Sequence, residues 1–573
     1  MQNRCPSDDD NAVVYKDVVI IGNGPSGICL SYMLAGNWPY YTGEPHPGDE
    51  MLTARLHFST RCGNEECNDG KVGAGGAAAE ARKQQQSRSE CEAKSQGGRG
   101  LARSTRCKLE CLSSGLEGRV GGRPLALLMD QLQHPCVDAG LDVPSLLTWK
   151  SVEQHPEHKV IDHVVLGKGE PGGSWQSMDP NVFTISLNRW MSLPDLDVRH
   201  WETLIGSEQV RKSNSAESSE SCAVYSFQEK LSACKPTSRI SVGTVAAYYN
   251  DYVRRKGLEQ YFRCGTMVTS VRPVGGGSND QEDNGGYGWM VEGFEKKTGK
   301  RFRYRCKRAV LATGTTDLSN RLGIPGEDSS PDWVTHDLND LELRLDRLIN
   351  RQRDDQELEE RPRPILVIGA GLSAADAIMA ARFRGIPVLH VFRDTSTEWS
   401  KADSGRIYTK YDRLQGLPSS MYPEYHKVYE MMADGGTNYP LYRALPGYTV
   451  VEIGVNGSER IDDTASDTRR AVTLSAPDGQ LHVFRVSIVG VLIGYKPDLS
   501  YLEAAGIGFG KYPDKPIDSK SNPIEVDNFT YEVTKAPRTG LYALGPLVGD
   551  NFVRYILGGA FGILAHILSA SNT

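Results

Sequence analysis

The chain has 573 residues, 39% of them apolar and 24% charged, which is the composition of a folded protein with about three domain-sized units. Its formal net charge is −7 and it has no basic block, so nucleic acid is not an expected partner. The twelve cysteines form no C-x-x-C pair, and the amino-terminal segment has no apolar core of the secretory kind. These features predict an intracellular, cytoplasmic protein with reduced thiols.

The segment DVVIIGNGPSG joins an apolar strand to three spaced glycines, Gly22, Gly24 and Gly27, with Pro25 and Ser26 between them. A strand, a G-x-G-x-x-G turn and a following helix form the unit that binds the pyrophosphate of a dinucleotide. The first glycine makes the turn, the second lets the backbone approach the pyrophosphate, and the third lets the helix pack on the strand. One such motif alone is weak evidence, and an ordinary βα turn is the alternative.

Glu44 follows this motif at the distance where an acidic side chain would accept hydrogen bonds from an adenosine ribose. The alternative is an exposed loop residue with no ligand.

Residues 61–108 are rich in small, polar and charged residues and have almost no large apolar side chain. We expect an insertion without order, because such a segment cannot bury enough surface. The irregular spacing of the cysteines in and after it predicts no metal site, although zinc is the alternative that they raise: Cys62, Cys67, Cys107 and Cys111. Residues 207–221 and 275–286 are predicted to be polar loops, the second at the tip of a hairpin.

A second strand-turn-helix follows a charged stretch, 350–364, which ends in prolines and predicts a domain boundary. The segment ILVIGAGLSAADAIMAARFRG repeats the first motif with Gly369 and Gly371, while Ala374 stands in place of the third glycine. Two such units in one chain predict two nucleotide sites, a more specific signal than one. Leu372 and Ser373 lie at the start of the second helix.

Arg393 ends the next expected strand, PVLHVFRD, where a side chain that recognises the nucleotide ribose would lie. An arginine there suits a 2′-phosphate and favours NADPH over NADH. A solvated surface arginine is the alternative.

The nearest approach to a membrane-spanning run is 552–568. It contains Arg554 and His566, so we expect a buried terminal helix and no membrane span.

Two dinucleotide units in this order resemble the flavoproteins that hold FAD and then NADPH. Further segments resemble elements of the same proteins, namely EPGGSWQSM (170–178), VAAYYNDYVRRKGLEQYF (245–262), RAVLATGTTD (308–317), VLIGYKPDL (491–499) and GLYALGPLVGDNFVRYILGGAFG (540–562). The resemblance implies that residues in these segments lie against the cofactors: Gly173, Ser174, Trp175, Thr313, Gly314, Gly494, Gly545, Asp550 and Asn551. Asp550 would meet the ribityl chain of FAD.

A narrower resemblance rests on VVLGKGEPGGSW, MYPEYHKVYEMM and ALGPLVGDNFVRYILGGAFG. Together these are similar to the oxidative stress-induced growth inhibitor family, animal proteins related to class B flavin monooxygenases. The likeness covers nearly the whole chain except the insertion and the polar loops. It implies a role in restraining cell growth and division, with growth-control partners that it does not identify.

The resemblance implies an α/β fold of two Rossmann-like domains. An FAD-binding domain would be discontinuous, built from residues 1–335 and 501–573, with the NADPH-binding domain inserted as residues 362–500. FAD would take hydride from NADPH, react with O₂ to a flavin C4a-peroxide and oxygenate an unknown small substrate. Trp175 could wall that pocket or belong to the core, and Asn188 is a candidate amide donor to the peroxide.

One segment departs from the related monooxygenases. Their F-x-G-x-x-x-H fingerprint corresponds here to SPDWVTH, where Ser330 and Asp332 replace the aromatic residue and the glycine, and His336 alone matches. This predicts poor coupling of NADPH oxidation to oxygenation, with His336 either functional or a plain linker residue. The alternative function is a catalytically weak flavoprotein that acts as a regulatory or redox-sensing scaffold. A disulfide reductase is disfavoured because the chain has no C-x-x-C pair.

Overall fold

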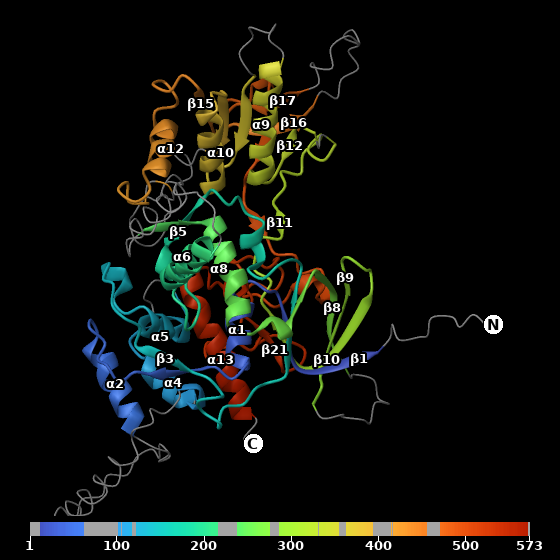
Figure 1. Ribbon diagram of the computed structural model, residues 1–573. Coiled ribbons are helices and arrows are strands. Elements are labelled where there is room, and N and C mark those ends of the chain that lie inside the picture. The colour runs from blue at the N-terminus through green and yellow to red at the C-terminus, as the bar shows by residue number, and fades with distance from the viewer. Residues whose placement is uncertain are drawn as a thin grey trace, which may run out of the picture. The chain divides into compact units, whose positions relative to one another are not determined.

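The computed structural model describes residues 12–61, 101–104, 106–116, 122–215, 238–274, 286–329, 332–354, 363–393, 414, 416–454 and 470–570. Within them the chain forms two compact units. Unit 1 contains the residues up to Thr315 and those from Pro497 onward, and unit 2 contains Thr316–Lys496. Figure 1 shows the elements of both units.

Unit 1 is built on a seven-stranded mixed sheet in the order β7-β4-β1-β10-β9-β8, with β21 also paired to β10. The neighbours of β1 on both sides, β4 and β10, run parallel to it, whereas β9 pairs antiparallel with β10, and β8 pairs antiparallel with β9. The strands of this sheet are β1 (Val13–Ile21), β4 (His163–Gly167), β7 (Phe262–Cys264), β8 (Thr266–Pro273), β9 (Trp289–Glu295), β10 (Arg301–Leu311) and β21 (Leu541–Ala543).

Smaller two-stranded sheets in unit 1 pair β2 (Trp38–Tyr41) with β3 (Leu147–Lys150) and β5 (Phe183–Leu187) with β6 (Arg239–Ser241). The α-helices of the unit are α1 (Pro25–Leu34), α2 (Glu50–Arg61), α4 (Arg106–Ser113), α5 (Pro124–Gln133), α6 (Val198–Ser215), α8 (Val242–Arg255) and α13 (Ile556–Ala570). Its 3₁₀ turns are η2 (Leu101–Arg103), η3 (Val137–Ala139), η4 (Gly173–Gln176), η5 (Asn188–Met191), η6 (Glu259–Tyr261), η7 (Glu503–Gly506), η8 (Gly545–Val548) and η9 (Val553–Tyr555).

The apolar pattern of β1 explains its central place. Val18 to Ile21 are buried on both faces of the sheet, as expected for a strand covered by helices on a parallel sheet. The strands that flank it end in register with it, because Ile21 pairs with Leu311 on one side and with Leu166 on the other. The carboxyl ends of β4, β1 and β10 therefore form one edge, which is where open α/β sheets bind ligands.

The carboxyl-terminal helix α13 is apolar around its whole circumference and packs against α1 and α5. Residues Val553–Ala570 are long and apolar enough to cross a membrane, but 78% of that window is buried inside the protein. An all-round apolar helix of this kind is a core helix, which agrees with the predicted buried terminal helix.

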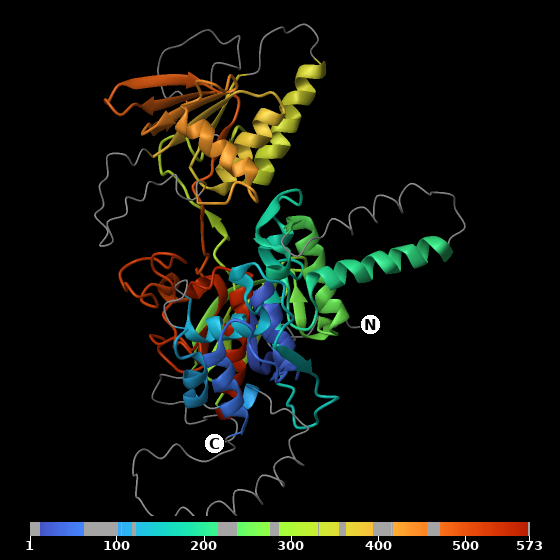
Figure 2. The same cartoon turned by 90° about the vertical axis from the view of Figure 1, so that its left-hand side faces the viewer.

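Unit 2 contains a five-stranded parallel sheet in the order β12-β19-β13-β14-β15 and a three-stranded antiparallel sheet, β16-β17-β18. Figure 2 shows these strands and the helices of this unit from a second direction. The elements are β11 (Leu318–Ser319), β12 (Val334–Thr335), α9 (Leu338–Asp354), β13 (Ile365–Ile368), α10 (Leu372–Phe383), β14 (Val388–Phe392), α12 (Pro423–Ala433), β15 (Tyr442–Pro446), β16 (Thr449–Ile453), β17 (Ala471–Ser475), β18 (Leu481–Arg485), β19 (Val489–Val491) and β20 (Tyr495–Lys496).

Unit 2 begins earlier than the predicted domain start at residue 362. β11 pairs with β20, β12 pairs with β19, and α9 packs on α10, so the chain from Thr316 onward belongs to this unit. The charged stretch that was predicted as a boundary begins inside α9, and residues 355–362 lie outside the described residues.

Two predicted irregular segments are partly helical. Leu101 and Ala102 of η2 are buried in unit 1, and α4 begins at Arg106. The prediction that residues 61–108 lack order is therefore wrong for the part that begins at Leu101. Residues 62–100 lie outside the described residues. The predicted polar loop 207–221 is wrong over its first part, because α6 continues through Ser215; Glu, Gln, Arg and Lys, which occur in this stretch, are good helix formers. The predicted hairpin is confirmed by the antiparallel pairing of β8 with β9.

Candidate nucleotide-binding sites

The first glycine turn connects β1 to α1 in unit 1. Gly22 has a φ of +114°, and a Cβ at that position would lie 2.2 Å from the carbonyl oxygen of Ala312. A Cβ on Gly27 would lie 2.1 Å from the carbonyl oxygen of Gly22. Both contacts are with backbone that cannot move aside, so only glycine fits at either position.

Gly24 differs from its neighbours because the space beside it is open. The nearest atom to a Cβ built on Gly24 is the carbonyl oxygen of Gly172, at 4.0 Å. Gly24 is also the N-cap of α1, and no side chain caps the helix there. The N–H groups of the first helical turn are therefore available to an anion, and the helix dipole favours negative charge at this point.

Three distant segments meet at this turn. A Cβ on Gly173 would lie 2.9 Å from the Cα of Gly24, and one on Gly545 would lie 2.4 Å from the Oγ of Ser26. The backbone nitrogen of Thr313 is 2.9 Å from the Cβ position of Gly22. The structure thus brings together the first motif, the G-G-x-W segment, the ATG segment and the carboxyl-terminal segment.

Other predicted site residues of the ATG and G-G-x-W segments make contacts within unit 1. Thr313 exchanges a hydrogen bond of 3.1 Å with the hydroxyl of Tyr501, and Gly314 has a φ of +71°. Ser174 and Trp175 lie on η4, where the Trp175 ring meets Tyr249 edge to face at 6.1 Å. Trp175 is half-buried against the core of unit 1, which is the packing alternative raised above.

Asp550 is a buried carboxylate near the end of the sheet, between η8 and η9. Its Oδ2 accepts a hydrogen bond of 2.9 Å from the hydroxyl of Tyr531. Burial raises the pKa of Asp550 to about 6, and the nearby charge of Arg123 and the Tyr531 hydroxyl offset only part of that rise. Asn551, next to it, is exposed and donates to the carbonyl oxygen of Ser519 at 3.4 Å.

Asn188 opens η5 and is fully buried. Its Nδ2 donates to the hydroxyl of Ser238 at 3.1 Å, and its Oδ1 accepts from the backbone N–H of Arg189 at 2.7 Å. Both ends of the carboxamide are thus engaged within the protein, so a role as a donor to a reacting oxygen would require one of these bonds to break.

The second glycine turn, in unit 2, connects β13 to α10 and repeats the first. Gly369 has a φ of +127°, and its Cβ would lie 2.3 Å from the carbonyl oxygen of Leu492. Gly371 is the N-cap of α10 without a side-chain cap, and a Cβ there would meet nothing within 4 Å. Leu372 and Ser373 begin the helix, and the third position is the buried Ala374.

Two further predicted residues lie in unit 2. Arg393 is exposed and follows β14, the parallel neighbour of β13, so it stands at the strand end where the sequence predicts it. Gly494 has a φ of +95°, and its carbonyl oxygen accepts from the backbone N–H of Asn320 at 2.9 Å.

His336 belongs to a hydrogen-bonded cluster within unit 2. Its Nε2 is 2.8 Å from an oxygen of the buried Glu327, and Arg321 approaches both ring nitrogens. Glu327 also accepts from the backbone N–H groups of Leu322 and Gly323. Despite burial, these donors lower the pKa of Glu327. The His336 ring is thus engaged by groups within unit 2; Asp332 is exposed, and Ser330 lies outside the described residues.

Glu44 does not stand where its predicted role requires. The strands that flank β1 are β4 and β10, while β2, which precedes Glu44, pairs with β3 in a separate two-stranded sheet. The prediction used the usual spacing between the glycine turn and the next parallel strand, but this chain places residues 35–162 between α1 and β4. Glu44 is exposed, and its backbone carbonyl accepts from the hydroxyl of Tyr41.

Sequence reasoning missed two residues that hold the glycine turns in place. Asn23 is buried, and its Nδ2 donates to the carbonyl oxygen of Gly169 at 2.7 Å. His390 is buried on β14; its Nε2 donates to the carbonyl oxygen of Gly369 at 2.6 Å and its Nδ1 accepts from the hydroxyl of Tyr442 at 2.8 Å. Burial lowers the pKa of His390 to about 4, so the ring is neutral. A polar residue inside the apolar strand PVLHVF was the available signal.

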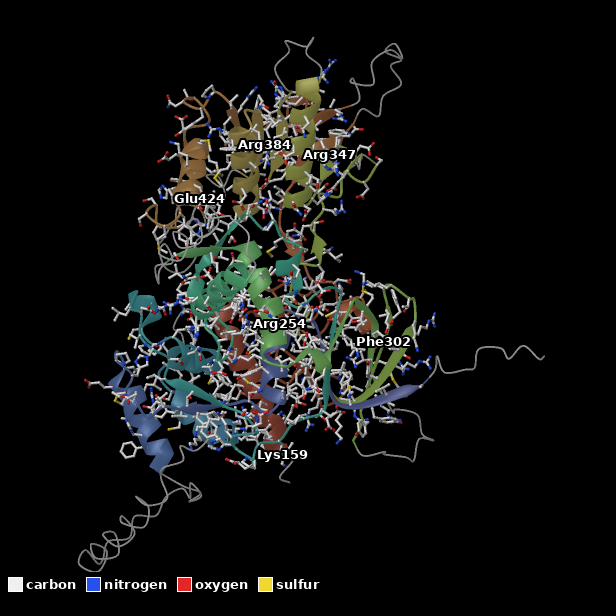
Figure 3. All side chains as sticks on the ribbon, in the orientation of Figure 1. Lys159, Arg254, Phe302, Arg347, Arg384 and Glu424 are labelled. Carbon is white, nitrogen blue, oxygen red and sulfur yellow. The ribbon has the colours of Figure 1, made fainter. Side chains whose placement is uncertain are left out.

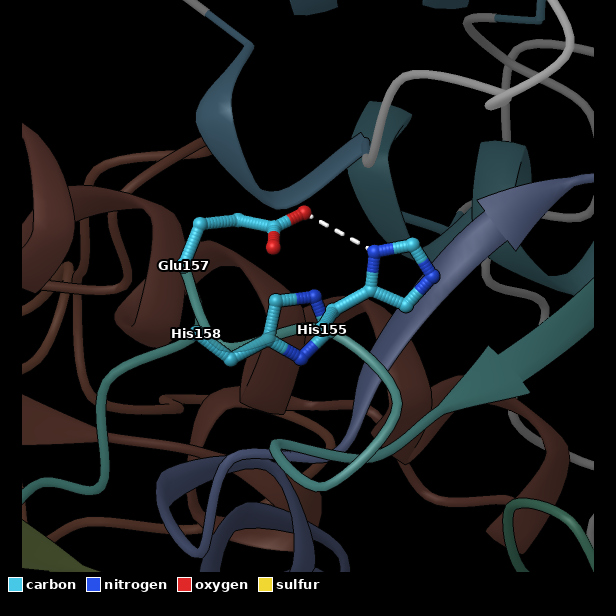
Figure 4. Close-up of side chains that lie close together, drawn as sticks. All are labelled: His155, Glu157 and His158. Carbon is cyan, nitrogen blue, oxygen red and sulfur yellow. Dashed lines mark hydrogen bonds and ion pairs between the residues drawn. The ribbon is translucent and has the colours of Figure 1, made fainter.

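One cluster of potential metal ligands, His155, Glu157 and His158, lies between β3 and β4 (Figure 4). The Nδ1 of His158 donates to the carbonyl oxygen of Gly36 at 2.9 Å, and its Nε2 accepts from the hydroxyl of Tyr40 at 2.7 Å. The rings of His155 and His158 are stacked with an interplanar angle of 17°. Lone pairs of two nearly parallel rings do not converge on one ion, so the arrangement is one of packing and hydrogen bonding.

Only two of the four cysteines that raised the zinc alternative belong to the described residues. Cys107 and Cys111 are exposed free thiols on α4, and Cys62 and Cys67 lie outside the described residues.

The fold and the sites define a mixed α/β protein with two glycine-rich strand-turn-helix units, each at the carboxyl edge of a parallel strand. Across 565 aligned residues the chain is 35% identical to human oxidative stress-induced growth inhibitor 1, covering 96% of this chain and 94% of that protein. It is 33% identical over 577 residues to human oxidative stress-induced growth inhibitor 2, covering 97% and 93%. The chain belongs to the oxidative stress-induced growth inhibitor family.

The Caenorhabditis elegans homolog osgn-1 is 25% identical over 565 residues, covering 97% of this chain and 95% of that protein. The solved structure of a bacillithiol disulfide reductase from Staphylococcus aureus is 13% identical to this chain and covers 98% of it and 100% of that protein's chain, with a TM-score of 0.47. No protein-family model matches the chain.

Proposed function

We propose that this chain is an FAD- and NADPH-dependent monooxygenase that oxygenates a small molecule with O₂. The proposal extends to the family's role in restraining growth, for which protein partners remain to be found. Location in the cytoplasm is likewise a prediction from the sequence.

The observation that carries the proposal is the repetition of one turn geometry in the two units. In each, the first glycine has a positive φ and abuts the backbone that follows a neighbouring strand, and the second caps a helix beside open space. A buried turn needs only the first feature. An open, uncapped helix N-terminus at a sheet's carboxyl edge is what a dinucleotide pyrophosphate requires.

In unit 1, Gly24 and the first turn of α1 would hold the pyrophosphate of FAD, with Gly173 and Thr313 alongside. When bound, FAD would supply the transfer of hydride from NADPH and the activation of O₂. The residues of the chain would bind and orient it, and Trp175 would help to exclude water from one side.

In unit 2, Gly371 and the first turn of α10 would hold the pyrophosphate of NADPH. Arg393 would pair with the 2′-phosphate, because a guanidinium presents two N–H donors in the geometry of a phosphate. His390 would keep the turn in shape through its bond to Gly369.

A second candidate is a flavoprotein with little turnover that acts as a regulatory scaffold. It is favoured by the surroundings of Asn188 and His336, both of which are engaged in intramolecular hydrogen bonds. On this reading the nucleotide sites would serve stability or redox sensing.

The test is oxygen consumption by purified protein loaded with FAD, with NADPH as the reductant. A monooxygenase would consume O₂ and, with metabolite extract as the substrate source, give a product heavier by one oxygen. Release of most of the oxygen as hydrogen peroxide would indicate poor coupling. Protein that binds both nucleotides yet consumes no O₂ would leave the scaffold as the function.

A further inference from the structure

A cleft of about 480 Å³ lies in unit 1 at the carboxyl ends of β4 and β7. This volume is in the range of small-molecule sites, about 300–1,000 Å³. Its wall is formed by the loop after β4, the end of β7 and one side of α8, with the lining residues Glu170, Pro171, Asn250, Arg254, Phe262 and Cys264 among others. Figure 3 labels Arg254 on α8.

One loop, residues 168–173, joins the wall of the cleft to the first glycine turn. The backbone N–H of Gly172 donates to the carbonyl oxygen of Asn23 at 2.9 Å, and Gly173 abuts Gly24. Glu170 is only two residues before Gly172. The loop that contacts the glycine turn at Gly172 and Gly173 thus also forms the cleft wall at Glu170 and Pro171.

The strand end itself cannot supply an acidic partner for that group. The last residue of β4 is Gly167, and a Cβ there would lie 2.1 Å from the Cγ of Asn23. The side chain of Asn23 fills this space and is held by its bond to Gly169. An acidic side chain, the usual partner of an adenosine ribose at the end of this strand, has no room at position 167.

Glu170 is the first acidic residue after the strand. Among the described residues its carboxylate has no hydrogen bond or ion pair, although it is exposed on the cleft wall. The Glu170 carboxylate acts on a neighbouring residue of the cleft wall. Burial raises the pKa of the Cys264 thiol, and the negative charge of Glu170 raises that pKa further. Asp251, by contrast, is engaged with Trp201, Arg254 and Arg255.

We propose that the carboxylate of Glu170 accepts hydrogen bonds from the ribose hydroxyls of the adenosine half of a dinucleotide, and that the cleft receives this adenosine. The inference rests on the proposed binding of FAD in unit 1. It reassigns to Glu170 the role that the sequence gave to Glu44. It also sets a specificity, because a carboxylate at this place repels a 2′-phosphate and accepts a free 2′-hydroxyl.

The test measures the affinity of FAD-free full-length protein for FAD by quenching of flavin fluorescence. Wild type is compared with Glu170→Gln, which keeps the size of the side chain, and with Glu44→Gln as the control for the same change of charge. Each protein is titrated with FAD and with an FAD analogue that has 2′-deoxyadenosine. A hydrogen bond to a charged acceptor predicts about a 10- to 100-fold loss of FAD affinity for Glu170→Gln and none for Glu44→Gln.

The analogue distinguishes a ribose contact from a general loss of charge. Wild type should bind the deoxy analogue more weakly than FAD, whereas Glu170→Gln should bind the two almost equally. Wild type that binds FAD while Glu170→Gln binds it equally well, or still discriminates against the deoxy analogue, would overturn the assignment of Glu170 alone. Wild type that binds no FAD would overturn both this inference and the proposed function.

Discussion

The two glycine turns share their first two positions and differ at the third. In unit 1, Gly27 packs so closely on the turn that a Cβ would lie 2.1 Å from the Gly22 carbonyl oxygen. In unit 2, the same position is the buried Ala374, so α10 leaves room for a methyl group. The comparison separates two requirements. The second glycine has no side chain, which keeps the space beside the helix N-terminus open. The third position matters only for how closely the helix packs on the turn.

The turns also differ in how they are anchored and in the charge beyond them. Asn23 fixes the first turn by a bond to Gly169, and the neutral His390 fixes the second by a bond to Gly369. The chain places an acid, Glu170, after β4 in unit 1 and a base, Arg393, after β14 in unit 2. Opposite charges at corresponding places suit a free ribose hydroxyl in one unit and a 2′-phosphate in the other.

The largest expected effect comes from Gly24→Val and Gly371→Val. Each adds a branched side chain to open space, so the fold should be kept while the pyrophosphate is excluded. Gly24→Val should purify without flavin colour and still bind NADPH, and Gly371→Val should stay yellow and not bind NADPH. Flavin absorbance and NADPH titration measure this, with circular dichroism as the check on folding. Variants that lose both nucleotides together would show that the two turns are not separate sites.

The third position gives the next effect. Gly27→Ala forces a methyl group against backbone and should destabilise unit 1 by about 3 kcal/mol. The matched change Ala374→Gly should cost only about 1 kcal/mol, through helix propensity. Urea unfolding of both variants measures the difference, and equal losses would contradict the closer packing of α1.

Asp550 gives a pH-dependent effect. Its pKa is raised to about 6 in the folded protein from 3.8, so folding favours the protonated acid. The folded state then binds more protons than the unfolded state between about pH 4 and pH 6, and stability falls as pH rises through this window. Asp550→Asn keeps the side chain neutral. In FAD-free protein it should match wild type near pH 4 and exceed it above pH 6 by up to about 3 kcal/mol.

Denaturant unfolding at several pH values tests this point. A variant that is less stable than wild type at pH 8 would show that the carboxylate makes favourable contacts that outweigh its burial.

The last effect is on the choice between NADPH and NADH. Arg393→Ala should cost about 1.5–3 kcal/mol in NADPH affinity and little in NADH affinity, because only NADPH carries the 2′-phosphate. Titration of both nucleotides against wild type and variant measures the ratio. Equal changes for both would place the discriminating residue elsewhere.

The sequence predicted local features better than long-range ones. The strands and helices at both turns follow from apolar runs and glycine spacing, since these residues interact with near neighbours in the chain. The ribose-binding role predicted for Glu44 assumed that the strand just before it is the parallel neighbour of β1. Motif spacing cannot show that more than a hundred residues separate α1 from β4, the parallel strand that follows it in the chain. Leu101 and Ala102 were assigned to a segment without order because composition averages over a window and misses a short apolar contact.

The surroundings of single polar side chains were also beyond prediction. Asn188 and His336 are residue types that are common in active sites. Their hydrogen-bond partners, Ser238 and Glu327, belong to none of the sequence motifs, so these contacts could not be predicted. Asn23 lies inside the first motif at a position where any residue is allowed, so its contact with Gly169 could not be read from the pattern.

The central claim is that unit 1 holds a flavin that NADPH, held by unit 2, reduces. Mixing FAD-loaded protein with NADPH under anaerobic conditions and following flavin absorbance tests it most directly, with Gly371→Val as the matched variant. We predict that wild type loses its flavin absorbance and that Gly371→Val stays yellow and oxidised. Wild type that binds FAD but is not reduced, or Gly371→Val that is reduced as fast as wild type, would contradict the account.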